Sequence, residues 1–509
     1  MKYAELVGKS AVELRRLIGS RHLSPVELLQ ACIERIEATN PFINAITATC
    51  FERAQAEAKE AENAVMQGKP LGLLHGLPFA VKDLESTAGL LTTMGTPSLK
   101  DNVPGSDSEI VRRLRAQGGV LLGKTNVPEM GAGANTRNPV WGATGNPFNP
   151  NLNAGGSSGG SAAALALDMA PVCTGSDTGG SLRIPAAKCG VVGFRPSPGV
   201  VPSARKVLGW SPISVVGPMG RDVSDACLQL AASAGPFAGD PLSYPLDPFE
   251  FLRLSRVDLS RLRVGWTEDF GICDVDPSIR RVMRDRIARM SPMFASCEQF
   301  SVDLGDVHRC FDVLRAEAFV AGMRATYERN PDSFGPNPRA NYEMGAKMSL
   351  LDAAWAQTEQ TQIVRKFQAL FDRFDIVLSP TTPVSPFAWI EPYASEIDGK
   401  AQPTYYRWLA LTYLVTLTTH PAISIPCGVD ESGMPFGLQA VGRFRGDADL
   451  LSISLSLEDA FHQDPVLRRP RPDVSALRPA VPSLRSIVEA PPADAFRHEP
   501  NALASGSVV

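Results

Sequence analysis

The sequence predicts an α/β fold, in which strands and helices alternate along the chain. Short apolar runs that read as buried strands alternate with longer stretches of helical composition, as an α/β layer fold requires. The composition is that of a globular protein, with 44% hydrophobic and 20% charged residues. The length of 509 residues corresponds to roughly three average domains, although α/β folds also use such a length as one large unit.

The N-terminal region is predicted to be helical. Ser10 is followed by Glu13, and Ser24 by Glu27, which is the spacing of a capping box at the start of a helix. A further stretch, FERAQAEAKEAENAVMQ, continues in helical composition. We expect helices at residues 10–39 and 51–67, within an N-terminal region of about residues 5–67.

Two short apolar segments that end in lysine are predicted to be buried strands. The first, GLPFAVK, ends at Lys82, and the second, VLLGK, ends at Lys124. Further along, residues 161–169 are rich in alanine and read as a helix, and residues 171–175 read as a strand. These elements form an expected catalytic core of about residues 70–235.

The remainder of the chain falls into two parts. Residues 240–375 are more charged and predominantly helical, and they open an expected helical and substrate-pocket region of about residues 240–465. Eight prolines fall in the last 45 residues, without apolar periodicity. We therefore expect one domain over residues 1–465 and a Pro-rich, disordered tail over residues 466–509.

Charge and cysteine content exclude several classes of protein. The net charge of -4 leaves no basic excess, so neither a nucleic-acid partner nor an anionic membrane surface is expected. The nine cysteines include no CxxC pair, which argues against a zinc site and a disulfide framework. No secretory signal and no long apolar run is apparent. We expect a soluble, cytoplasmic protein without a metal or organic cofactor.

The most informative segment runs from Ala154 to Gly190 and contains two glycine-framed serine clusters. The first is GGSSGG, with Ser157 and Ser158, and the second is DTGGS, which ends at Ser181. Glycine permits backbone conformations and close approaches that other residues do not. Successive N–H groups in such turns form anion-binding nests. A serine at the end of a nest combines a nucleophile with an oxyanion site, which indicates acyl transfer.

A serine nucleophile needs a base, and the usual base is histidine. No histidine lies near either cluster in sequence, although triad partners are often remote. The six histidines are His22, His75, His308, His420, His462 and His498.

Shorter patterns match the motifs of other enzyme classes, but each of these matches is weak evidence. GSSGG matches the G-x-S-x-G elbow of α/β-hydrolases with Ser158 as nucleophile, and it leaves the second cluster unexplained. Ser203 to Lys206 matches S-x-x-K, yet neither S-D-N nor K-T-G accompanies it. A Walker A loop is excluded because Ser161, and not Gly-Lys, follows the glycine pair.

Lysine is the alternative base, and Lys82 is the candidate. A free lysine has a pKa of about 10.4 and is protonated at pH 7. Burial at the end of the apolar run LLHGLPFAVK would lower that pKa. The plainer interpretation pairs Lys82 with Asp83 or Glu85 on the surface, and the residue pattern alone favours it.

Several segments together resemble the amidase signature family. Residues 155–185 match the family's glycine- and serine-rich signature, GGSSGGS followed by GSDTGGS and LRIP. GLPFAVKD resembles the family's lysine block, and GKTN, GNP, SPTTP and SIP resemble further segments. The resemblance covers roughly residues 5–465. One departure is Ala154, where proline is common.

The resemblance implies a fold and a mechanism. The fold would be a single large domain with a central mixed β-sheet covered by helices on both faces. The enzyme would be an amidase that hydrolyses non-peptide amides. Its triad would be Ser-cisSer-Lys, with Ser181 as nucleophile, Ser157 as proton bridge and Lys82 as base. The backbone N–H groups of Thr178, Gly179, Gly180 and Ser181 would stabilise the oxyanion, and Ser158, Asp177 and Arg183 would support the site.

The substrate and the partners are less defined by the sequence. Seven aromatic residues are candidates for an apolar acyl pocket, although packing in the core explains them equally well: Phe387, Trp389, Tyr393, Tyr405, Tyr406, Trp408 and Tyr413. As a pocket, they favour a small-molecule aryl or apolar amide. Many relatives are dimers, so a homodimer is the default expectation.

Two other functions stay open within the same family. The first is that of the A subunit of a glutamyl-tRNA amidotransferase, which works with partner subunits. That protein commonly has glutamine after the signature arginine, whereas this chain has Ile184. The second is a catalytically silent binding protein, and the presence of all three triad candidates argues against it.

Overall fold

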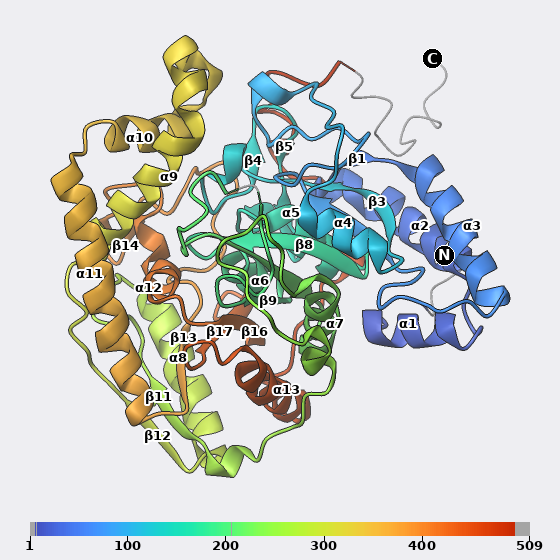
Figure 1. The fold of residues 1–509 in the computed structure, drawn as a ribbon. Coiled ribbons are helices and arrows are strands. Elements are labelled where there is room, and N and C mark those ends of the chain that lie inside the picture. Colours follow the sequence, from blue (N-terminus) through green and yellow to red (C-terminus); the bar gives the residue numbers. More distant parts are fainter. Residues whose placement is uncertain (1–5, 7, 205, 494–509) are drawn as a thin grey trace.

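The computed structural model describes residue 6, residues 8–204 and residues 206–493. Its centre is an eleven-stranded sheet with the strand order β1-β3-β2-β8-β10-β9-β16-β17-β13-β11-β12 (Figure 1). The strands of this sheet are β1 (Ile46–Thr49), β2 (Pro78–Lys82), β3 (Val120–Thr125), β8 (Val172–Asp177), β9 (Val192–Arg195), β10 (Val215–Gly220), β11 (Arg263–Trp266), β12 (Ser296–Gln299), β13 (Ile376–Pro380), β16 (Ala422–Val429) and β17 (Pro435–Val441).

The sheet is mixed, and its parallel part positions the serine clusters. β2 runs parallel to both of its neighbours, β3 and β8, and Ala80 is the partner of Cys173. The carboxyl ends of parallel strands meet at one edge of a sheet. Lys82 at the end of β2 therefore lies beside the end of β8, where Asp177 opens the second serine cluster.

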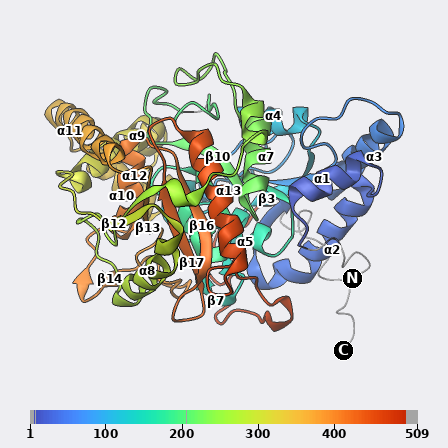
Figure 2. The same cartoon turned by 90° about the horizontal axis from the view of Figure 1, so that it is seen from below.

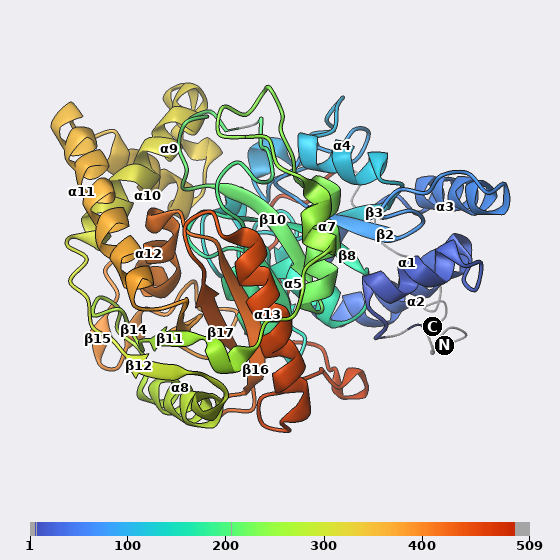
Figure 3. The ribbon, with the colours of Figure 1, turned by 60° about the horizontal axis from the view of Figure 1, so that its bottom comes forward.

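Helices cover both faces of the sheet, as the sequence resemblance implied. α5 and α6 contact the sheet on one face, and α7 and α13 pack against it on the other (Figure 3). The helices of the described residues are α1 (Ala11–Gly19), α2 (Pro25–Ile43), α3 (Phe51–Met66), α4 (Glu109–Ala116), α5 (Gly159–Ala166), α6 (Arg183–Cys189), α7 (Val223–Ser233), α8 (Pro277–Met290), α9 (Val307–Arg329), α10 (Pro336–Gly345), α11 (Leu350–Gln368), α12 (Ala410–Thr418) and α13 (Asp447–Gln463).

Two groups of helices lie at the two ends of the molecule. The blue helices α1, α2 and α3 lie at one end, and the yellow-to-orange helices α9 to α12 lie at the other (Figures 1 and 2). Three small hairpins flank the sheet: β4 (Arg137–Asn138) with β5 (Gly142–Ala143), β6 (Gly145–Asn146) with β7 (Asn149–Asn153), and β14 (Glu396–Ile397) with β15 (Lys400–Ala401).

The helix starts predicted near the N-terminus are confirmed. Ser10 Oγ accepts a hydrogen bond of 3.1 Å from the N–H of Glu13. Ser24 forms a complete capping box, in which the Glu27 carboxylate accepts from the Ser24 N–H at 3.2 Å. These bonds satisfy N–H groups that the first turn of a helix leaves without partners.

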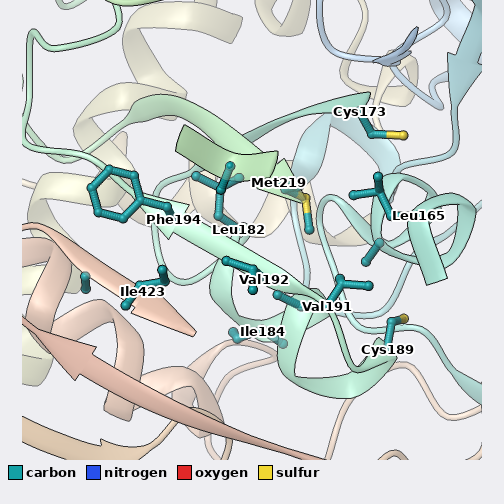
Figure 4. Close-up of a cluster of buried hydrophobic side chains, with 14 of the residues drawn as sticks. Leu165, Cys173, Leu182, Ile184, Cys189, Val191, Val192, Phe194, Met219 and Ile423 are labelled. Atoms are coloured by element: carbon teal, nitrogen blue, oxygen red, sulfur yellow. The ribbon is translucent and has the colours of Figure 1, made fainter. Parts of the chain in front are cut away.

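The core lies directly beneath the second serine cluster. Leu165 of α5 and Ile184 of α6 pack against side chains of the sheet, among them Val192 of β9 and Met219 of β10 (Figure 4). Ile184 is 1% exposed and Leu165 is fully buried. The serine-bearing loops are thus anchored on a close-packed layer that does not shift easily.

The expectation of a disordered tail is wrong for residues 466–493. Leu477 and Leu484 are each 5% exposed, and Leu484 packs with Trp389. The Ala143 N–H donates to the carbonyl of Leu484 at 2.8 Å. Prolines break periodicity, but they do not prevent an irregular segment from burying isolated leucines. Residues 494–509 lie outside the described residues.

In the described part of the chain, no helix combines the length and apolarity that a membrane span requires.

Candidate active site

Lys82 lies at the end of β2 with its side chain fully buried. Its Nζ donates hydrogen bonds to Ser157 Oγ and Ser158 Oγ, both at 2.8 Å, and to Ser176 Oγ at 3.0 Å. No carboxylate among the described residues forms a salt bridge with it. Burial lowers the pKa of Lys82 to about 7, although the charges of Asp177 and Glu85 oppose this shift.

The interpretation of Lys82 as a surface ion pair is wrong. The neighbouring Asp83 carboxylate accepts a hydrogen bond from Thr93 Oγ1 at 2.6 Å and lies 3.9 Å from Lys124 Nζ. Successive side chains of a strand point to opposite faces. Asp83 therefore has its own partners, and Lys82 faces the serines.

Ser157 and Ser158 occupy the turn between β7 and α5. The peptide bond between Gly156 and Ser157 is cis. Ser157 lines a cavity and accepts from Lys82, whereas Ser158 is fully buried and its N–H donates to the carbonyl of Ser181 at 3.3 Å. Ser158 thus contacts both Lys82 and the loop, and its burial disfavours it as the nucleophile of a hydrolase elbow.

Ser181 lies in the turn between β8 and α6, half-exposed at the same cavity as Ser157 and Ser176. Asp177 fixes the backbone of this turn through hydrogen bonds. Its carboxylate accepts hydrogen bonds from the N–H groups of Gly180 at 2.9 Å and Leu182 at 3.2 Å. The turn therefore presents the Ser181 hydroxyl to the cavity on a fixed backbone.

Two arginines neutralise Asp177 in the interior. Arg183 donates to both carboxylate oxygens at 3.0 Å, and Arg195 donates at 3.2 Å. All three side chains are fully buried. Burial alone would raise the pKa of Asp177, but the two guanidinium groups hold it well below its usual range. Asp177 and Arg183 thus shape the loop and do not line the cavity.

One of the four backbone N–H groups predicted to bind the oxyanion already has a partner within the protein. The Gly180 N–H points to Asp177 and is not free to bind an oxyanion. Among the described residues, no acceptor engages the backbone N–H groups of Thr178, Gly179 and Ser181. Gly180 has a φ of +121°, and an added Cβ would lie 2.2 Å from Thr412 Oγ1. Glycine is therefore required there for backbone shape.

The cavity beside Ser181 has a volume of about 300 Å³, at the small end for a ligand site. Most of its wall is apolar and comes from three places: the loops that carry Leu84 and Met130, the loop that carries Leu208 and Ile213, and helix α9, which contributes Phe319 and Met323. Its polar groups are mainly serine hydroxyls, and the charged side chains that the described residues contribute are Lys206 and Arg315.

The expected aromatic pocket is wrong, because none of the seven predicted aromatic residues lines this cavity. They pack elsewhere. Phe387 and Trp408 lie against the buried ammonium of Lys188, at 4.4 and 4.9 Å. Tyr413 stacks on Phe311 at 4.3 Å. Packing in the core, the other interpretation of these residues, holds.

Sequence reasoning missed several residues of the site. Ser176 stands immediately before Asp177 in the signature, and its proximity was a usable signal. Met130 and the α9 residues carry no recognisable pattern, because their role depends on how distant segments meet. Lys206 also lines the cavity, but it lies 3.8 Å from Asp240 and does not form the S-x-x-K pair.

No histidine in the described part of the chain contacts either serine cluster. His75 binds the carbonyl of Ala61, His308 binds Tyr413, and His420 binds Gln368. His498 lies outside the described residues. Within those residues, no group of three or more His, Cys, Asp or Glu side chains is arranged to hold a metal ion.

Comparison with known proteins agrees with this geometry. The family model described as Amidase matches residues 27–451. The chain therefore belongs to the amidase signature family, and it is a hydrolase that acts on the carbon–nitrogen bond of amides.

Individual relatives span nearly the whole chain. An acylamidase of Rhodococcus erythropolis is 33% identical over 458 residues, which cover 88% of this chain and 94% of the relative. The A subunit of the glutamyl-tRNA(Gln) amidotransferase of Moorella thermoacetica is 32% identical, with 92% and 99% covered. The solved structure of a bacterial aryl acylamidase has a TM-score of 0.82 at 30% identity, and 89% of this chain and 96% of that chain are covered.

Proposed function

We propose that this amidase hydrolyses a small amide with an apolar, aryl-sized scaffold, through an acyl-enzyme on Ser181. The observation that carries the proposal is the bond between the Lys82 ammonium nitrogen and Ser157 Oγ, in a site where Ser157 and Ser181 face the same cavity. The cavity volume and its apolar wall fit a single aromatic ring better than a long chain.

In the first half-reaction, neutral Lys82 accepts a proton from Ser157 while Ser157 accepts one from Ser181. Ser181 Oγ forms a bond with the carbonyl carbon, and the oxyanion lies against the N–H groups of Thr178, Gly179 and Ser181. One such donor is typically worth about 2.7–4 kcal/mol in the transition state.

Collapse of the tetrahedral intermediate breaks the carbon–nitrogen bond. Lys82 returns its proton through Ser157 to the leaving nitrogen, so the amine departs neutral and the acyl-enzyme forms. Water then repeats the sequence, with its proton taken along the same path, and releases the carboxylic acid. The side-chain partners of Lys82 Nζ are serine hydroxyls, which exchange protons without a fixed charge that would hold the lysine in its charged form.

The direct test is product analysis by mass spectrometry with the purified chain alone. Aryl, alkyl and amino-acid amides, glutamine included, are incubated with the wild type and with Ser181→Ala. We expect turnover of an aryl amide and none by the variant. Turnover of glutamine alone, or of no amide without added partner proteins, would favour the amidotransferase function, which relatives at about 30% identity represent.

The remaining expectations about partners are also proposals. A homodimer is our default proposal for the assembly, and mass photometry of the purified chain tests it directly. We propose a cytoplasmic location on the basis of the nine free cysteines, which reducing conditions keep as thiols.

A further inference from the structure

Helix α9 carries a guanidinium group into the wall of the cavity. Arg315 is only 6% exposed, and it lines the same cavity as Ser181. Burying a charged group is costly unless an opposite charge compensates. The partners of Arg315 therefore decide whether its role is structural or directed at a ligand.

The partners of Arg315 within the protein are neutral. Its Nε donates to the Asn341 side-chain oxygen at 3.0 Å, and one terminal nitrogen donates to the hydroxyl of Tyr405. The guanidinium also lies 5.0 Å from the ring centre of Phe319. No carboxylate forms a salt bridge with Arg315 anywhere in the described residues.

The acid on the same face of the helix already has other partners. Asp312, one turn before Arg315 on α9, accepts from Arg407 at 2.7 Å and from the Tyr406 hydroxyl at 2.8 Å. The half-buried Asp312 and the buried Arg315 therefore do not pair with each other, and Arg315 has no carboxylate salt-bridge partner among the described residues.

The cavity lining also carries more positive than negative charge. Among the described residues, its lining includes two cationic side chains, Arg315 and Lys206, and no aspartate or glutamate. Lys206 is partly balanced by Asp240 at 3.8 Å. The rest of the lining is mostly apolar, with serine and threonine hydroxyls as neutral polar groups. Such a cavity attracts an anion to its cationic side chains and offers apolar contacts to the scaffold that carries it.

We propose that the preferred substrate is an amide that carries a carboxylate on its apolar scaffold, and that Arg315 binds this carboxylate. The proposal rests on the proposed function, since it assigns the substrate class of that site. A guanidinium matches a carboxylate through two parallel N–H···O bonds, which lysine cannot offer. The substrate would then supply the counter-charge that Arg315 does not find among the described residues.

The test compares amides that differ only in this charge. 4-Carbamoylbenzoate and 4-acetylbenzamide are nearly equal in shape, as are 4-acetamidobenzoate and 4-acetamidoacetophenone, which place the charge on the leaving side. In the wild type we expect kcat/KM for the carboxylate of one pair to exceed that of its ketone by about 10- to 100-fold, the usual effect of a charged hydrogen bond. Arg315→Met should abolish that ratio.

Two further variants control the experiment. Arg309 lies on the same helix outside the cavity, where it pairs with Asp352 at 2.9 Å, so Arg309→Met should keep the wild-type ratio. Arg315→Lys keeps the positive charge but lacks the paired N–H donors of a guanidinium, so it should give an intermediate ratio. This variant decides the question if Arg315→Met does not fold.

Several outcomes would overturn the proposal. Equal kcat/KM within both pairs in the wild type means that Arg315 serves packing alone, and a ratio that persists in Arg315→Met assigns the preference to another group. If the wild type hydrolyses no amide, the proposed function fails, and binding to Ser181→Ala decides this inference separately. Calorimetry should then show tighter binding of 4-carbamoylbenzoate than of 4-acetylbenzamide, and equal affinities would reject the anion site.

Discussion

At the scale of single residues, the chemistry depends on a lysine that is buried among hydroxyl groups. Three serines accept hydrogen bonds from Lys82, and no carboxylate in the described residues stabilises its charged form through a salt bridge. Removal from water disfavours the ammonium and leaves much of the lysine neutral near pH 7. The serine signature and the lysine block thus form one unit, although they are far apart in the sequence.

The pH dependence of catalysis follows from this lysine. Because the base must be neutral, kcat/KM of the wild type should rise with pH through a midpoint near 7 and then level off. Lys82→Ala should lose about 10²- to 10⁴-fold at pH 7 and recover partly at high pH. Steady-state kinetics from pH 5 to 10 measure both.

Lys188 provides a matched control for that profile. It is also fully buried, and burial lowers its pKa to about 7, but it contacts Asn153 and two aromatic rings and no serine. Lys188→Met should keep the wild-type midpoint. A midpoint that moves with Lys188, or a Lys82→Ala enzyme of normal activity at pH 7, would contradict the lysine relay.

Asp177 should matter for stability as much as for catalysis. Asp177→Asn leaves the buried guanidinium groups of Arg183 and Arg195 without a counter-charge. Loss of one partner of a buried pair typically costs about 3–5 kcal/mol. Denaturant unfolding measures the cost. The surface pair of Asp375 with Arg263 is the control, and Asp375→Asn should change the free energy of unfolding far less.

At the scale of elements, the site is made by strand ends. β2 and β8 are parallel neighbours, so Lys82 and the loop after Asp177 meet at one edge of the sheet. α5 and α6 start directly after the two serine clusters and fix both turns against the core. The strands that carry Lys82 and precede Ser181 were predictable from short apolar runs. Strands β11 and β12, at one end of the sheet, were not, because four-residue strands in a charged, helical region have no periodicity to detect.

The packing of the C-terminal segment was also not predictable from the sequence, because an irregular segment has no periodic pattern. Its leucines are isolated between prolines, yet Leu484 packs with Trp389 and Ala143. Leu484→Ala should therefore reduce the free energy of unfolding by about 2 kcal/mol or more. Val481, three positions earlier, is 83% exposed and provides the control.

Thermal and denaturant unfolding of both variants measure this difference. Val481→Ala should leave the unfolding midpoint unchanged. Equal midpoints for the two variants would mean that residues 466–493 contribute nothing to the fold, as the sequence alone predicted.

At the scale of the whole molecule, the signature carried more information than any other part of the sequence. It predicted the family and the mixed sheet with helices on both faces, and it contains three predicted site residues that line the cavity, Ser157, Thr178 and Ser181. It did not predict the opposite wall, because Phe319, Met323 and Arg315 come from a helix more than a hundred residues away. The aromatic residues that looked like a pocket are close to each other in sequence, but their side chains pack into the core.

The identity of the nucleophile is the central claim, and active-site labelling tests it most directly. The purified chain is incubated with phenylmethanesulfonyl fluoride, and the modified peptide is mapped by mass spectrometry. We expect one sulfonyl group on Ser181, complete loss of amide hydrolysis, and no label on Ser181→Ala. A label on Ser157 or Ser158, or full activity after Ser181 is modified, would contradict the mechanism.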